Sequence, residues 1–219
     1  MNDWPGHPAD RGFWRRQLPA LAAFVLLPAL IELTLSAADL GLIANTRLRL
    51  TAYQNGAFWA GLLDNWRPNY AGQPELMFVT YSFLHAGLWH LVGNMLSLLF
   101  LMRLTAGELG GWRFLLVYVV SAIGGALGFA LLGTALNPMV GASGAIFGLA
   151  GAWRWMEWRL IAKPRDRALV ALRDIALLSA LNAIMWLMQD RALAWEAHLG
   201  GFIAGAAVMA ALPRRRQAQ

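Results

Sequence analysis

A serine and a histidine that lie far apart in the sequence are the residues best suited to do chemistry. Ser143 stands in the tetrapeptide Gly141-Ala142-Ser143-Gly144, where a turn passes into an apolar helix. The first N–H groups of a helix lack intrahelical acceptors and lie at the positive end of its dipole, so they can stabilise an oxyanion beside this serine. His198 lies near the start of the last apolar segment, and a rise of about 1.5 Å per residue places it at a similar depth. The pair predicts a nucleophile with its general base.

Small residues next to both side chains favour a close approach of their helices. Gly144 and Gly148 are spaced by four residues, and so are Gly201 and Gly205. Such stripes let helix backbones pack closely, which a Ser–His hydrogen bond requires. Each observation alone has a plainer explanation, because glycine stripes serve ordinary packing and a lone membrane histidine can be hydrogen-bonded inside the bundle. The combination is what predicts catalysis.

Two further polar residues lie in the second apolar segment. His90 and Asn94 are four residues apart, so they share one face of a helix. Each offers a side-chain N–H donor, and two neutral donors suit a developing oxyanion better than a metal ion. Hydrogen bonding between helices is the alternative interpretation. His85 lies off this face, and we interpret it as a residue at the mouth of the site or one that supports it.

The elements that must position these residues are membrane helices. The chain is 58% hydrophobic, only 14% charged and free of cysteine. An ordinary soluble domain is about a quarter charged, and a chain without cysteine has no disulfide framework, cysteine–zinc site or thiol nucleophile. The net charge of +6 would suit nucleic acid only if the basic residues clustered on one face. They punctuate apolar runs instead, so we expect a lipid bilayer and no nucleic acid as partner.

A membrane-spanning helix takes about 20 apolar residues, and the sequence offers six such segments. We predict one all-α membrane domain over residues 18–213, between an N-terminal segment 1–17 and a basic tail 214–219. Its helices are expected near residues 18–42, 83–103, 113–133, 142–161, 168–189 and 197–212. The long outer loop between the first two, about residues 43–81, is predicted to carry an interfacial amphipathic helix. A loosely packed cap is the alternative.

The distribution of Lys and Arg predicts the orientation. If the N-terminus is cytoplasmic, the only basic residues on the outer side are Arg47, Arg49, Arg67 and Arg191, of 18 in the chain. Because cytoplasmic segments carry the excess of Lys and Arg, both termini are expected in the cytoplasm. We expect an integral protein of a bacterial inner (cell) membrane.

Other chemistries lack the residues they need. A zinc metalloprotease would show HExxH, and an aspartyl mechanism would need a pair of aspartates inside the spans. Glu32 and Asp39 lie late in the first helix near Arg47 and Arg49, with which we expect them to pair at the outer edge. A transporter would be expected to show internal repeats or paired broken helices, which are absent from the sequence. We predict no metal and no cofactor.

Taken together, these motifs resemble the rhomboid family of intramembrane serine proteases over about residues 80–205. The segment from His90 to Asn94 resembles the family's H-x-x-x-N, and His85 stands where the family often has another histidine. Residues 141–144 match its GxSG nucleophile motif. Residues 197–201 with Gly205 resemble its A-H-x-x-G-x-x-x-G, and Glu108 matches a common acidic position.

The resemblance implies a six-helix rhomboid-like bundle and a serine endopeptidase with a dyad of Ser143 and His198, without a third acid. It implies an oxyanion held by His90, Asn94 and the Ser143 N–H, and substrates that are transmembrane segments of other proteins, cut near their outer end. Access is implied to pass beside the fifth helix. Supporting roles are expected for Gly141, Gly144, His85, Phe147 and Gly201.

Two positions depart from the family's pattern. Many relatives have a tyrosine four residues after the nucleophile, where this chain has Phe147, which can stack on the histidine but offers no hydroxyl. The family's Trp-Arg pair in the first outer loop falls here on Leu76-Met77, and Trp66-Arg67 comes ten residues too early.

The rival hypothesis is a non-proteolytic rhomboid-like protein that binds membrane clients. Loss of the serine or the histidine would favour it, and this chain keeps both. Neither hypothesis specifies an oligomeric state.

Overall fold

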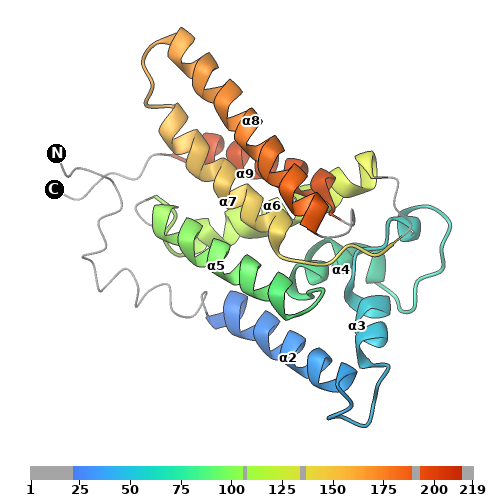
Figure 1. The fold of residues 1–219 in the computed structure, drawn as a ribbon. Helices are drawn as coiled ribbons and strands as arrows, with labels where there is room; N and C mark the ends of the chain where they lie inside the picture. Colours follow the sequence, from blue (N-terminus) through green and yellow to red (C-terminus); the bar gives the residue numbers. More distant parts are fainter. Residues whose placement is uncertain (1–21, 106–107, 134–136, 189–192, 214–219) are drawn as a thin grey trace.

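The computed structural model describes residues 22–105, 108–133, 137–188 and 193–213, and this part of the chain is mostly helical (Figure 1). The expected segments 1–17 and 214–219, and the first four residues of the first expected helix, lie outside it. The elements are, in order, η1 (Ala22–Leu26), α2 (Leu27–Asp39), α3 (Leu48–Gly56), η2 (Ala60–Leu63), α4 (Gln73–Thr80), η3 (Tyr81–Phe83), α5 (Leu88–Thr105), α6 (Trp112–Leu132), α7 (Ser143–Trp158), α8 (Pro164–Met188) and α9 (Trp195–Ala211).

Six of these elements correspond to the six expected helices, with shifted ends. The first ends at Asp39 rather than near residue 42. The second begins at Leu88 rather than near residue 83, because the backbone turns at Gly87, whose φ of 99° suits glycine. The fifth begins at Pro164 rather than near residue 168, since proline is well placed in the first turn of a helix, where its missing N–H is not needed.

Among the described residues, four helices are long and apolar enough to cross a membrane. They cover residues 22–39, 88–105, 112–132 and 164–187. The two remaining bundle helices are shorter, with 16 residues in α7 and 17 in α9. The protein is therefore an all-helical integral membrane protein.

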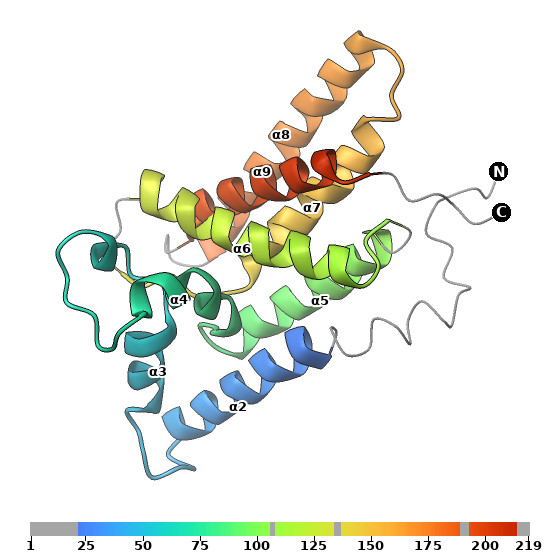
Figure 2. The same ribbon diagram turned by 180° about the vertical axis from the view of Figure 1, so that it is seen from behind.

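Helix α7 lies at the centre of the bundle, with most of its residues buried. It packs against α5, α6 and α9, and α9 also packs against α6. Both views place α2 at one edge, beside α5, and α8 at the opposite edge (Figure 1 and Figure 2). The close packing of α7 against α9 is what brings the beginnings of these two helices together.

Glycines allow α7 and α9 to touch along their backbones, as the matching stripes predict. A Cβ atom added to Gly201 would lie 1.9 Å from the Gly144 carbonyl oxygen, and one added to Gly205 would lie 1.9 Å from that of Gly148. We call this contact, formed by Gly144, Gly148, Gly201 and Gly205, the glycine seam. No larger residue fits at these two α9 positions unless the helices separate.

The loop between α2 and α5 folds into a compact cap. Phe58 and Met139 exchange two backbone hydrogen bonds of 3.0 Å. Three large side chains of the cap, Phe58, Met77 and Tyr81, are buried. The helical pattern predicted here appears as α3 and η2, and its position on the outer leaflet stays a prediction. The sequence analysis did not predict helix α4.

Candidate active site

The structure brings the two predicted reactive residues together. Ser143 is the first residue of α7, and His198 lies in the first turn of α9. Nε2 of His198 lies 2.9 Å from Oγ of Ser143, which is hydrogen-bond distance for a nucleophile and its base. His198 is buried, at 1% exposure, and Ser143 is half-buried. The arrangement can deprotonate a serine hydroxyl, and the catalytic roles stay predictions.

Phe147 holds the face of the histidine ring. It lies one turn after Ser143 on α7, and its ring stacks on that of His198 with 4.1 Å between centroids and 4° between planes. A stacked ring restrains the histidine without a hydroxyl, as the sequence analysis expects from phenylalanine at this position. Stacking therefore fixes the ring plane, and the hydrogen bonds at its nitrogens fix its rotation.

His90 and Asn94 lie against the backbone just before Ser143. Gly141 has a φ of 122°, a conformation that only glycine adopts readily. A Cβ atom there would lie 2.7 Å from Cε1 of His90 and 3.7 Å from Nδ2 of Asn94. The Asn94 amide donates a hydrogen bond to the His90 carbonyl (3.1 Å) in this state. The two side chains thus border the serine's turn, as expected of residues that would hold an oxyanion.

The hydrogen bonds of His90 define which of its nitrogens can donate. The Ala86 N–H donates to Nδ1 of His90 at 3.3 Å, so Nδ1 is an acceptor and the proton of the neutral ring is on Nε2. Nε2 is the nitrogen that faces Gly141. His85 is fully buried and meets the His90 ring edge to face, with 5.3 Å between centroids. The structure places His85 in the loop before α5, and its supporting role stays a prediction.

Asn182, an amide that the sequence analysis does not name, completes this cluster. Oδ1 of Asn182, on α8, lies 2.6 Å from Nδ1 of His198. The sequence signal that could have found it is an amide inside an apolar span, where polar side chains are rare and costly.

Comparison with known proteins supplies the family. The family model described as "Rhomboid domain" matches residues 73–215, more than half of the 219 residues. The chain belongs to the rhomboid family. The match includes α4 and every bundle helix except α2, and it contains all the site residues named above.

Several curated rhomboid relatives are similar in sequence. RHOMBOID-like protein 1 of Arabidopsis thaliana is 36% identical over 129 residues, which are 58% of this chain and 31% of the relative. The putative rhomboid protease YdcA of Bacillus subtilis is 32% identical over 151 residues, 67% of this chain and 72% of the relative. RHOMBOID-like protein 6, mitochondrial, of Arabidopsis thaliana is 31% identical over 148 residues, 66% of this chain and 46% of the relative. The chain spans less than half the length of these plant relatives.

In this rhomboid, an arginine of α3 anchors the loop before α5. Arg49 contacts Glu32 at 2.7 Å and Asp39 at 2.6 Å, so the expected pairing of both acidic residues is confirmed for Arg49, one of the two expected partners. Its hydrogen bond to the fully buried Glu32 raises the pKa of Arg49. Nη1 of Arg49 and the hydroxyl of Tyr53 both donate to the His85 carbonyl, at 3.0 and 2.8 Å. The cap is thereby tied to the loop that carries His85.

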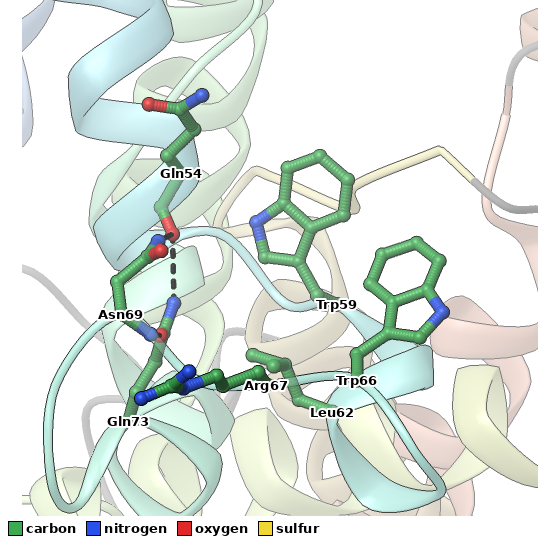
Figure 3. A pocket seen from close by; sticks show the side chains of 7 residues that line it. All are labelled: Gln54, Trp59, Leu62, Trp66, Arg67, Asn69 and Gln73. Atoms are coloured by element: carbon green, nitrogen blue, oxygen red, sulfur yellow. Dashed lines mark hydrogen bonds between the residues drawn. The ribbon is translucent and has the colours of Figure 1, made fainter.

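The Trp-Arg pair of the outer loop lies elsewhere. Of the aligned pair, Leu76 is exposed and Met77 is buried in the core. Trp66 and Arg67 instead border an open cavity of ≈ 170 Å³ (Figure 3). It lies wholly within the cap, and its lining residues are Gln54, Trp59, Leu62, Trp66, Arg67, Asn69 and Gln73. None of the predicted site residues borders it.

Glu108, the acidic residue after α5, lies at the far end of α7 from the serine. Its Oε1 accepts a hydrogen bond of 2.8 Å from Arg159. In the described part of the chain, no three histidine, aspartate or glutamate side chains are grouped as a metal site would require. The site's polar groups are instead a hydroxyl, imidazoles and amides, which suit proton transfer and oxyanion binding.

Proposed function

We propose that this rhomboid is an intramembrane serine endopeptidase that uses Ser143 as nucleophile and His198 as general base. The observation that carries the proposal is the 2.9 Å contact between Ser143 Oγ and His198 Nε2. Ser143 begins α7 and His198 lies in the first turn of α9, and these helices lie against each other along the glycine seam. Relatives named as rhomboid proteases support the same activity.

The reaction follows from these positions. Ser143 Oγ attacks the scissile carbonyl carbon while its proton passes to Nε2 of His198. The imidazolium gives this proton to the leaving nitrogen as the C–N bond breaks. Water then attacks the acyl ester, and His198 takes a proton from this water and returns it to Ser143. Each proton transfer thus uses the same atom, Nε2 of His198.

The negative charge on the tetrahedral intermediate needs donors. The Ser143 N–H at the start of α7, Nε2–H of His90 and the Asn94 amide are the proposed ones. The Asn94 amide nitrogen carries two N–H groups, so one can keep its bond to the His90 carbonyl while the other donates to the oxyanion. Gly141 leaves the space between His90 and the reacting carbonyl free.

The substrates we propose are transmembrane segments of other membrane proteins. The site is built at helix ends of an integral membrane bundle, where such a segment is the available peptide. The distribution of Lys and Arg supports a protein with both termini in the cytoplasm, and an inner-membrane location is proposed with it.

The test is reaction of the purified protein with a fluorophosphonate probe, alongside cleavage of a single-pass membrane substrate. Ser143→Ala should abolish both, while leaving the melting temperature in detergent unchanged. Ser97→Ala is the matched control, because Ser97 lies exposed on α5. Full cleavage by Ser143→Ala would overturn the proposal. Client binding by a chain that neither labels nor cleaves would favour the non-proteolytic alternative.

A further inference from the structure

The second ring nitrogen of His198 is held by a helix that packs little against the bundle. Nδ1 of His198 lies 2.6 Å from Oδ1 of Asn182, on the side of the ring opposite the contact with Ser143. Asn182 comes from α8, where no residue from Pro164 to Leu187 is fully buried. A polar side chain in an apolar span is costly unless it has a function or a partner, and here the partner is the proposed base.

The amide's own contacts define its orientation. Nδ2 of Asn182 lies 2.8 Å from the Leu178 carbonyl oxygen, which can only accept a hydrogen bond. The nitrogen of the amide must therefore face Leu178, and its oxygen must face His198. An amide oxygen is also only an acceptor, so Nδ1 of His198 must carry the proton. In a neutral ring Nε2 is then unprotonated and accepts the hydroxyl proton of Ser143.

We propose that Asn182 is a positioning residue of the catalytic centre, which holds His198 as the Nδ1–H tautomer with Nε2 aimed at Ser143. This inference rests on the proposed function. Asn182 exchanges no proton during the reaction: Nδ1–H stays on His198 while Nε2 takes and returns the serine proton. When the ring becomes an imidazolium, its Nδ1–H still has the amide oxygen as acceptor.

A neutral partner suits this environment. A buried carboxylate next to His198 would have to be desolvated, which is costly unless it is fully paired. An amide orients the ring at lower cost, although it offers less stabilisation to the imidazolium. Since α8 supplies it, displacement of α8 would also remove the acceptor from Nδ1. The competence of the base is therefore linked to the position of α8.

The first test separates Asn182→Leu, which has no acceptor, from Asn182→Asp, which keeps an oxygen at the same position. Asn182→Leu should lower kcat and the rate of fluorophosphonate labelling by about 10- to 100-fold, with KM changed by less than about threefold. Asn182→Asp keeps the acceptor at Nδ1, so its kcat should stay within severalfold of the unmodified protein, although the added carboxylate should lower the melting temperature. The control is Ser179→Leu, because Ser179 is an exposed residue of α8 and tests the effect of a leucine on this helix.

The second test reads the tautomer directly and needs no activity. The protein is labelled with ¹⁵N-histidine, and His198→Gln assigns the His198 signals among the four histidines. The unmodified protein should show protonated Nδ1 and unprotonated Nε2, and Asn182→Leu should shift the population toward the Nε2–H form. A structural role alone would not change the tautomer. Asn182→Ala repeats the test if Asn182→Leu does not fold.

The outcomes distinguish this inference from the proposed function. If the unmodified protein labels at Ser143 but shows an Nε2–H tautomer, the role of Asn182 is overturned and the protease stands. Labelling of Asn182→Leu at the unmodified rate overturns it as well. If the unmodified protein never labels but shows the Nδ1–H tautomer bound to Asn182, the proposed function fails and the contact is structural.

Discussion

The two helices that meet His198 are attached to the protein in opposite ways. Helix α7 is joined to α9 through the glycine seam, where carbonyl oxygens of one helix occupy the space that a side chain would take on the other. Helix α8 has no fully buried residue from Pro164 to Leu187. Among its side-chain contacts with α7 and α9 are Arg167 over the ring of Trp158, Arg154–Asp174 at 2.6 Å and, further along, Asn182–His198.

This difference assigns separate tasks to the two helices. The seam sets the distance between Ser143 and His198, because it fixes two backbones that each carry one of these residues. Helix α8 sets the rotation of the histidine ring through one hydrogen bond. Changes in the seam should therefore destroy the site together with the fold, whereas changes on α8 should alter activity while the bundle stays intact.

The largest effect is expected from Gly201→Ala. The added Cβ atom would start 1.9 Å from the Gly144 carbonyl oxygen, so the helices must separate by about 1 Å. A displacement of that size at a catalytic pair costs on the order of 100-fold in rate, and overpacking destabilises by about 1–3 kcal/mol. Substrate cleavage and the melting temperature should both fall.

Gly93→Ala is the control for this prediction. Gly93 is a helical glycine of α5 that has nothing within 4 Å of an added Cβ atom, so the substitution should leave activity unchanged and stabilise α5 slightly, by helix propensity. Equal behaviour of the two variants would show that the seam does not set the Ser143–His198 distance.

The next largest effect is a loss of stability where α3 contacts α2. Arg49→Gln leaves the carboxylate of Glu32, which is 0% exposed, without its cation, and breaking a buried pair costs about 3–5 kcal/mol. It also removes a donor from the His85 carbonyl. The midpoint of thermal or denaturant unfolding in detergent measures the loss. Arg67→Gln, at an exposed arginine of the cap, is the control and should leave the midpoint unchanged. A shift of similar size in Arg67→Gln would contradict a specific stabilising role for the Arg49–Glu32 pair.

A smaller effect is expected where the ring of His198 meets α7. Phe147→Leu removes the stacked ring but keeps an apolar side chain. Aromatic pairs contribute about 0.5–1.5 kcal/mol beyond burial, so kcat should fall roughly 2- to 10-fold with KM unchanged. Phe147→Tyr keeps the ring and should retain activity. If Phe147→Leu were fully active, the seam and Asn182 alone would hold the histidine.

Much of this arrangement was predictable from the sequence because it depends on local patterns. Long apolar runs predict the bundle helices, and the four-residue spacing of glycines predicts the seam that brings Ser143 to His198. The tetrapeptide around Ser143 predicts the serine at a helix start. The spacing of residues within one segment is enough to predict each of these features.

The rest depends on contacts that spacing does not carry. Helix α8 is apolar on all sides apart from a few residues, so no pattern predicts which face Asn182 presents. The pairing of Glu32 with Arg49 was predicted, but no spacing predicts that Arg49 also donates to the His85 carbonyl in the loop before α5. Helix α4 is short and mixes polar with apolar residues, so neither hydropathy nor periodicity predicts it.

The smallest effect is expected from Asp174→Asn, which weakens the ion pair between α8 and Arg154 of α7. The Arg154 side chain would keep its hydrogen bond to Glu157, so no cation is left unpaired, and the loss of stability should stay within about 1 kcal/mol. Because α8 is then held less firmly, Asn182 should occupy its place at Nδ1 for less of the time, and kcat should fall about two- to threefold. Combined with Asn182→Leu, the substitution should have no further effect on kcat, since the contact through which α8 acts is already lost. Full additivity of the two rate losses would mean that α8 influences the site by another route.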